Sequence, residues 1–179
     1  MRKWFFIVSV LLLIGCTSTE TVYEIGDTGP AGGLIFYVNE SDSDEWKYLE
    51  AAPSDQGINM AWGCSGTLID GADGTAVGTG AQNTMDIIAG CSTVGIAAKI
   101  CDDLLFGGYS DWYLPSRDEL NSMYVNLVQN GLGDFSSTPY WCSTEYDANS
   151  AQLQYLDNGS QTQANKDYDF YRVRAVRAF

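Results

Sequence analysis

Carboxylates, thiols and aromatic rings are the groups in this sequence that could do chemistry, because the chain contains no histidine. That absence excludes Ser-His-Asp and Cys-His catalysis and the usual zinc sites. Asp70 and Asp73 lie in a glycine-containing loop, and residues 42–45 offer alternate carboxylates. Calcium takes several such oxygens, so Asp70 and Asp73 are the candidate metal ligands. We favour turn chemistry for both loops and expect no cofactor, with calcium as the alternative.

The thiols suggest cross-links. Four cysteines follow Cys16, and outside the cytoplasm an even number indicates disulfides, with three ways to connect them. Cys64 and Cys91 lie in a loop-rich part of the chain, and we expect them to pair. This bond would close about 28 residues and stabilise the fold by roughly 3–4 kcal/mol. Cys101 lies on the apolar face of an expected helix, so it is either a buried free thiol or, by elimination, the partner of Cys142.

The composition is acidic and aromatic. The chain has 23 Asp and Glu against 9 Lys and Arg, together with 11 Tyr, 7 Phe and 5 Trp. Such a charge repels nucleic acid and bare anionic lipid, so neither is expected as a partner of the domain surface. The 19 glycines indicate many turns. With the aromatic content, they favour short strands and irregular loops over a helical bundle.

The N-terminus has the pattern of a bacterial lipoprotein signal. Two cations precede an apolar stretch of 11 residues, Trp4–Ile14, which is too short to span a bilayer because spanning takes roughly 20 residues. Leu13 to Cys16 resembles a lipobox, in which the Cys16 thiol receives acyl chains such as palmitate. We therefore expect residues 1–15 to be a signal peptide, residues 16–24 a lipidated tether and residues 25–179 one domain. Thr17, in place of Asp, favours the outer membrane.

The elements expected to position these groups are strands near both ends of the domain and helices between them. Strands are expected over residues 34–38, 46–51, 140–143, 151–156, 161–165 and 170–178. Residues 53–83 form a loop-rich stretch. Helices are expected from Asn83 or Thr84, over residues 94–105, and from Ser116, where Ser116 and Glu119 match a capping box. Helices precede a closing antiparallel sheet, so the predicted class is α+β.

Three segments, in order, resemble the signature of a known family. They are Gly108–Leu120 (GYSDWYLPSRDEL), Tyr140–Glu145 (YWCSTE) and Val173–Arg177 (VRAVR). The family is named after the C-terminal domain of the Legionella collagen-like protein, and the resemblance extends over nearly all of residues 25–179. It implies a C-type-lectin-like fold, with small helices flanking a twisted antiparallel sheet and long loops on one side. It also implies a surface role and supplies no catalytic set. Cys142 departs from the pattern, where Ser is usual.

The signature segments contain the charged candidates for ligand binding. Asp111, Arg117 and Glu145, together with the adjacent Tyr146, are the candidates for contact with a ligand. For the charged residues we favour buried ion pairs and helix caps over ligand contact. Asp118 with Glu145 is also the carboxylate pair that a glycoside hydrolase would need.

Aromatic residues near the strand ends offer a second kind of site. Tyr155, Tyr168 and Tyr171, like Tyr146, fall where exposed rings could stack on a sugar or peptide. Trp112 and Trp141 are interpreted as core residues rather than a sugar platform.

The combined prediction is a lipid-anchored binding module of the cell envelope, not an enzyme, that recognises a surface glycan or protein. Its membrane contact is expected through the N-terminal lipid. The alternatives are a structural envelope lipoprotein and a carboxylate-dependent glycosidase.

Overall fold

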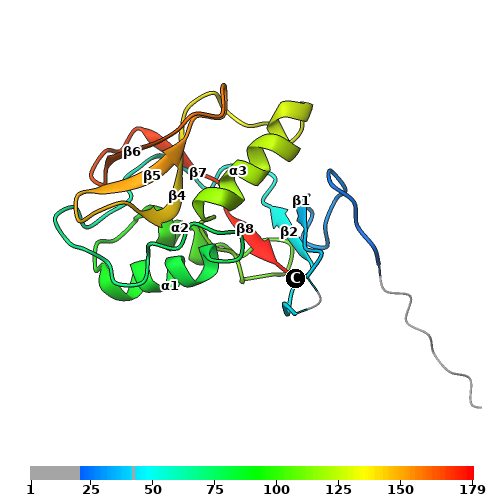
Figure 1. Cartoon of the computed structure of the whole chain (residues 1–179), viewed down its shortest axis with the longest axis horizontal. Helices are drawn as coiled ribbons and strands as arrows, with labels where there is room; N and C mark the ends of the chain where they lie inside the picture. The colour runs from blue at the N-terminus through cyan, green and yellow to red at the C-terminus, as the bar shows by residue number, and fades with distance from the viewer. Residues whose placement is uncertain (1–20, 42) are drawn as a thin grey trace, which may run out of the picture.

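The computed structural model describes residues 21–41 and 43–179, which form two small sheets and three short helices (Figure 1). One sheet has three antiparallel strands in the order β1-β2-β8, and it joins the beginning of the domain to its end. Its strands are β1 (Leu34–Val38), β2 (Tyr48–Ala51) and β8 (Val176–Ala178). Register pairs Ala51 with both Leu34 and Val176, so β2 is the central strand.

The second sheet has five strands in the order β3-β7-β4-β5-β6. They are β3 (Gly57–Met60), β4 (Tyr140–Glu145), β5 (Ser150–Gln154), β6 (Gln161–Asn165) and β7 (Tyr171–Val173). The pairs are antiparallel except for β4 with β7, which run parallel. The sheet is therefore mixed rather than purely antiparallel, and the predicted α+β class is confirmed.

Alternation along the strands places two hydrophobic cores on opposite faces of the five-stranded sheet. The first core takes Trp141, Leu153 and Val173 from the sheet and covers them with α1 (Gly80–Gly90) and α2 (Ala97–Asp102). The second core takes the neighbouring positions Tyr140 and Cys142 and covers them with α3 (Arg117–Asn126). Figure 1 shows α1 and α2 below this sheet and α3 to its right.

The sequence signals for helix ends predicted the start of one helix correctly and the start of another wrongly. Helix α3 has the predicted capping box, because Ser116 Oγ accepts from the Glu119 N–H and the Glu119 carboxylate accepts from the Ser116 N–H. Helix α1 begins at Gly80, so the prediction that Asn83 or Thr84 caps it was wrong. Both side chains are buried inside the helix and hydrogen-bond to other loops: Asn83 donates to Gly74 O, and Thr84 bonds with the Leu114 backbone. A 3-10 turn, η1 (Val128–Asn130), follows α3.

Two strand predictions needed correction. The loop-rich stretch 53–83 contains β3, which pairs with β7 more than a hundred residues later. The strand expected over residues 170–178 is two strands, because β7 belongs to the five-stranded sheet and β8 to the three-stranded one. The other strands match their predicted positions within a few residues, and β1 and β6 match at both ends.

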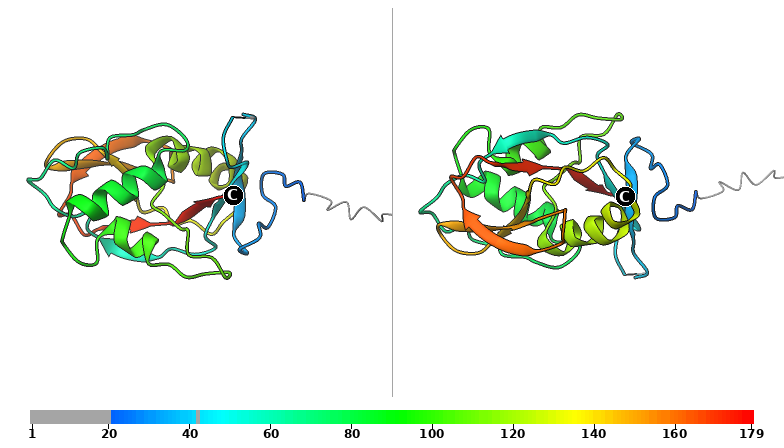
Figure 2. Two further views of the ribbon diagram at one scale, coloured as in Figure 1. Left: turned by 90° about the horizontal axis from the view of Figure 1, so that it is seen from below. Right: turned by 90° about the horizontal axis from the view of Figure 1, so that it is seen from above.

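The molecule is elongated, and its two ends differ. The chain enters at the end where the C-terminus lies, beside the β1–β2–β8 sheet, whereas the connection between β6 and β7 lies at the far end (Figures 1 and 2). The predicted signal peptide, Cys16 and most of the tether lie outside the described residues. Within residues 21–41 and 43–179, no helix is long and apolar enough to cross a membrane.

Candidate functional site

Loops from three parts of the chain meet at the end of β4. The Glu145 N–H donates to Ala72 O at 2.7 Å, and Thr144 Oγ1 donates to Gly74 O at 2.8 Å. The Arg117 N–H in turn donates to Thr144 Oγ1 at 3.0 Å. These bonds fix residues 63–78, which contain five glycines and which we call the glycine-rich loop, and the start of α3 to strand β4. The bond from Arg117 to Thr144 also joins two of the signature segments.

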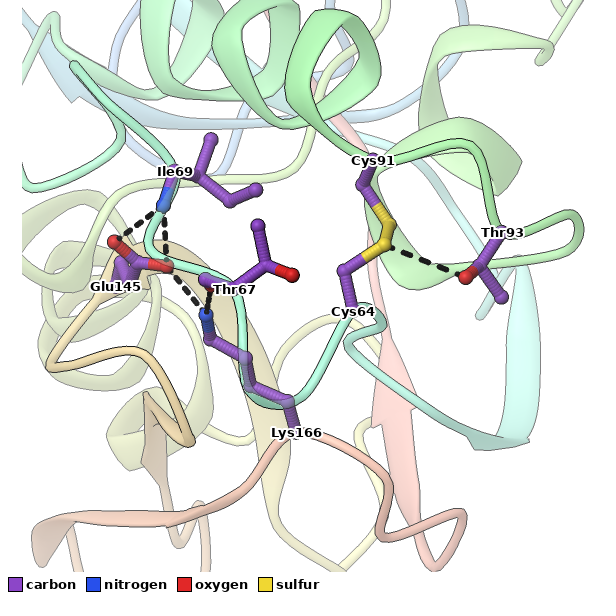
Figure 3. Close-up of a disulfide and its surroundings, with 7 residues drawn as sticks. All are labelled: Cys64, Thr67, Ile69, Cys91, Thr93, Glu145 and Lys166. Atoms are coloured by element: carbon purple, nitrogen blue, oxygen red, sulfur yellow. Dashed lines mark hydrogen bonds and ion pairs between the residues drawn. A yellow bond between two sulfur atoms is a disulfide. The ribbon is translucent and has the colours of Figure 1, made fainter.

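A buried ion pair holds this loop from inside (Figure 3). Lys166 Nζ donates to the Glu145 carboxylate and to Thr67 O, the latter at 2.8 Å, and it lies 4.7 Å from the centroid of the Trp62 ring. The Ile69 N–H donates to the same carboxylate at 3.0 Å. The side chains of Lys166 and Glu145 are 0% and 3% exposed. Glu145, a candidate for ligand contact, is therefore enclosed, and the buried ion pair that we favour from the sequence is confirmed for it.

The predicted Cys64–Cys91 disulfide is confirmed, and it ties the same loop to the end of α1 (Figure 3). The two Cα atoms are 5.8 Å apart. Cys91 is buried, and the Cys64 sulfur lies 3.3 Å from Thr93 Oγ1. The covalent bond and the ion pair thus restrain the stretch from Cys64 to Ile69 at both ends.

Of the two alternatives for Cys101, the buried free thiol is confirmed and the disulfide with Cys142 is wrong, because both cysteines are buried and unpaired. Cys101 belongs to the first core and Cys142 to the second, so they lie on opposite faces of the sheet. The Cys142 thiol donates to Gln152 O at 3.2 Å. Burial raises the pKa of both thiols, that of Cys142 to about 12, so neither is a nucleophile at neutral pH.

Asp111 forms an ion pair at the opposite end of the domain from the β6–β7 connection. Its carboxylate accepts two bonds from the Arg177 guanidinium, each at 2.8 Å. Arg177 also donates to buried Glu50 at 3.3 Å. The hydrogen bonds from Arg177 lower the pKa of Asp111 below its ordinary value. The expected ligand residue therefore helps fix the last strand, although half of its side chain is exposed.

Arg117 and Asp118 pair with each other at the start of α3. Arg117 Nε donates to Asp118 Oδ1 at 2.9 Å, and both side chains are partly exposed. Asp118 and Glu145 thus occupy different environments, one at the surface and one enclosed with Lys166. Hydrolysis by this pair would require Glu145 to leave its buried partners before a substrate could reach it.

The predicted metal ligands do not converge. Asp70 and Asp73 are both exposed on the glycine-rich loop. In the part of the chain that the structure describes, no group of three or more His, Cys, Asp or Glu side chains could hold a metal ion. Asp44 accepts a bond from Asn39 Nδ2 at 2.7 Å, as a turn residue does. Asp42 lies outside the described residues.

Four aromatic side chains gather at the margin of the first core, and we call them the aromatic surface: Tyr155, Tyr168, Phe170 and Tyr171. Phe170 is 66% exposed and Tyr168 is 50% exposed, and their rings meet edge to face at 6.5 Å. Tyr155 and Tyr171 are half-buried against the core. Burial raises the pKa of Tyr171, and the charges of Tyr155 and Tyr168 raise it further.

Buried tryptophan supports the aromatic surface from beneath. The ring of Trp141 meets that of Tyr171 at 4.7 Å, nearly perpendicular, and its Nε1 donates to Met60 O at 2.8 Å. Trp141 and Trp112 are both buried, so their interpretation as core residues is confirmed. Because Trp141 is fixed by both contacts, the half-buried part of the aromatic surface rests on a rigid base.

Sequence reasoning missed two residues of this region. Phe170 was assigned to a strand, because the alternation of Asp167, Tyr168, Asp169 and Phe170 is typical of a half-buried strand, but the structure places all four residues exposed in the β6–β7 connection. Lys166, which locks the glycine-rich loop, has no signal in the sequence that separates it from a surface lysine. Tyr146 is 57% exposed in the turn between β4 and β5, at the other end of β5 from Tyr155. The structure therefore separates Tyr146 from Tyr155, whereas the β4–β5 turn is bonded to the start of the β6–β7 connection through the Lys166 N–H and Asn149 O at 2.9 Å.

The family model of the Lcl C-terminal domain matches residues 45–177. The chain belongs to this family. The matched residues of this Lcl C-terminal domain include the whole glycine-rich loop, the three helices and the five-stranded sheet. A comparison with curated proteins finds no match.

Proposed function

We propose that this chain is a lipid-anchored binding module of the bacterial envelope, in which a C-type-lectin-like domain presents the aromatic surface to a neutral glycan or a protein. Residues 1–15 are the signal, Cys16 carries the acyl chains, and the outer membrane is the expected location. The order of small helices and a twisted mixed sheet supports the lectin-like assignment.

The single observation that carries the binding role is the exposed aromatic surface on a rigid base. Exposed Tyr and Phe rings supply contact area at little cost in conformational entropy, which is why such residues dominate recognition sites. The exposed Asp167 and Asp169 alternate with Tyr168 and Phe170 and add hydrogen-bond acceptors for hydroxyl or amide groups. They also disfavour polyanions, as does the net charge of −14.

An array of neutral and charged glycans, probed with the mature protein with and without calcium, tests this function. We expect binding to neutral glycans that is lost in the Tyr168→Ala, Phe170→Ala double variant and does not need calcium. Tyr146→Ala is the matched control, because it removes a similarly exposed tyrosine that lies in the β4–β5 turn and is not part of the aromatic surface. Absence of any glycan or protein ligand would favour a structural envelope role.

The anchor is tested separately by Cys16→Ser. The variant should lose acylation, remain unprocessed by the lipoprotein pathway and leave the detergent phase, whereas the wild-type protein partitions with detergent. A variant that still partitions as the wild type does would contradict the anchor.

A further inference from the structure

The N-terminal segment is packed onto the domain from Tyr23 onward. The Tyr23 ring meets the ring of Tyr48 at 5.3 Å and that of Phe179 at 5.7 Å, edge to face in both cases. The Tyr23 N–H also donates to Tyr48 Oη at 3.3 Å. The free part of the predicted tether is therefore shorter than residues 16–24, because its last residues are docked against the C-terminal strand region.

A hollow of about 340 Å³ lies beside the disulfide, away from the docked segment. A second hollow, at the docked segment, combines aromatic rings with a lysine. This second hollow, which we call the tether hollow, has a volume of about 300 Å³. It is lined by Tyr23, Pro30, Lys47, Tyr48, Tyr109 and Phe179. The Arg177 guanidinium lies 3.9 Å from the Tyr109 ring centroid and 5.0 Å from that of Phe179. Since Arg177 is already paired with Asp111 and Glu50, it stiffens the aromatic walls.

Lys47 is the charged group of the tether hollow. Six of the seven lysines and arginines within residues 21–41 and 43–179 form ion pairs with carboxylates, and Lys47 is the exception. It is exposed, and its backbone N–H donates to Phe179 O at 2.8 Å. Lys47 therefore has no carboxylate partner among the described residues, and it lies beside aromatic rings at the end of the molecule where the chain enters.

The proposed anchor brings this end of the molecule close to a membrane. Thr21 follows Cys16 by only five positions, and five extended residues span at most about 17 Å. The β6–β7 connection, which carries Tyr168 and Phe170, lies at the far end of the molecule (Figure 2). A domain held this closely by its tether end therefore presents the aromatic surface away from the bilayer.

We infer that the tether hollow is a membrane-contacting site, in which a phospholipid headgroup of the anchoring leaflet places its phosphate on Lys47 and its glycerol region against the tyrosine rings. The inference rests on the proposed acylation of Cys16. Tyrosine is enriched at the membrane–water interface because one end of the ring is apolar and the other polar. Lysine supplies a point charge for phosphate. The acidic remainder of the domain favours zwitterionic over anionic lipid.

Fluorescence quenching on vesicles tests this inference. Phe179→Trp places a probe at the rim of the tether hollow, and Tyr168→Trp places the matched probe on the aromatic surface. The mature lipoprotein variants are inserted into phosphatidylethanolamine–phosphatidylcholine vesicles that carry a nitroxide on the headgroup, and the wild-type tryptophan signal is subtracted. We expect the emission of the residue-179 probe to fall by at least half and that of the residue-168 probe to remain unchanged. Lys47→Glu in the Phe179→Trp background should weaken the quenching.

Three results would overturn the inference. If the protein floats with the vesicles but the two probes are quenched equally, the acylation is supported and the proposed contact between the tether hollow and the membrane is wrong. If Lys47→Glu leaves quenching at residue 179 intact, the phosphate contact is wrong. A wild-type protein that does not float with the vesicles at all would remove the acylation and this inference together.

Discussion

Replacing Lys166 by methionine is the sharpest test of how the glycine-rich loop is held. The substitution keeps a buried aliphatic side chain but removes the ammonium that donates to Glu145 and Thr67 O and lies over the Trp62 ring. Both charged side chains are enclosed, so the Glu145 carboxylate would remain buried with only the Ile69 N–H as a donor. Removing one partner of a buried pair costs about 3–5 kcal/mol. That is a large share of the roughly 5–15 kcal/mol that stabilises a typical domain.

Urea unfolding followed by tryptophan fluorescence, without reductant, measures the loss as a lower midpoint at unchanged slope. The Glu145→Gln, Lys166→Met double variant should be more stable than Lys166→Met alone, because it removes the uncompensated charge. Lys99→Met is the matched control, since Lys99 makes its ion pairs at the exposed surface and the midpoint should not move. A Lys166→Met midpoint equal to that of Lys99→Met would refute the proposed role of the buried pair.

Three further predictions concern thiols and a buried carboxylate. The Cys64→Ala, Cys91→Ala double variant should unfold with about 3–4 kcal/mol less free energy under oxidising conditions; an unchanged melting temperature would contradict this. Cys101 and Cys142 should resist alkylation in the native protein at pH 8 and both react after denaturation, as counted by intact mass; labelling of the folded protein would show that they are accessible. Burial raises the pKa of Glu119 to about 7, from 4.5 in the unfolded chain, so the folded state holds this proton more tightly. The stability that this proton contributes is present in full below pH 4.5 and is lost as the pH rises through 7, by roughly 1.4 kcal/mol per pH unit. The Glu119→Gln variant should lack that slope in unfolding experiments. Equal pH profiles of stability for the two proteins would contradict the raised pKa of Glu119.

Elements with strong local signals could be predicted from the sequence. Helix α3 is marked by its capping box, and the β5–β6 hairpin by the Asn158-Gly159 turn, in which Gly159 has a positive φ of 78°. Strand β3 could not be predicted, because it is a four-residue strand without regular alternation, and its pairing with β7 is made by a distant part of the chain. The composition of residues 170–178 likewise does not show that they divide between two sheets, because that division is made by pairing with distant strands.

The candidate site shows the same division between local and non-local information. The sequence identified the tyrosines but not which of them lie together, since Tyr155, Tyr168 and Tyr171 come from different connections and strands. It also could not assign Glu145, because its enclosure depends on Lys166, 21 residues later in the chain. Charged residues in signature segments proved to hold loops together, as Asp111 and Glu145 do, and the exposed rings were left as the candidate contact surface.

The most direct test of the central claim is the affinity of the mature protein for the strongest ligand found on the array, measured by isothermal titration calorimetry. The proposed binding surface predicts that Tyr168→Ala with Phe170→Ala weakens binding by 2 kcal/mol or more, about 30-fold, as loss of aromatic anchors does at recognition sites. Tyr146→Ala should bind as the wild type does. If the double variant retained wild-type affinity while Tyr146→Ala lost it, the ligand would bind at the β4–β5 turn and the aromatic surface would not be the binding site.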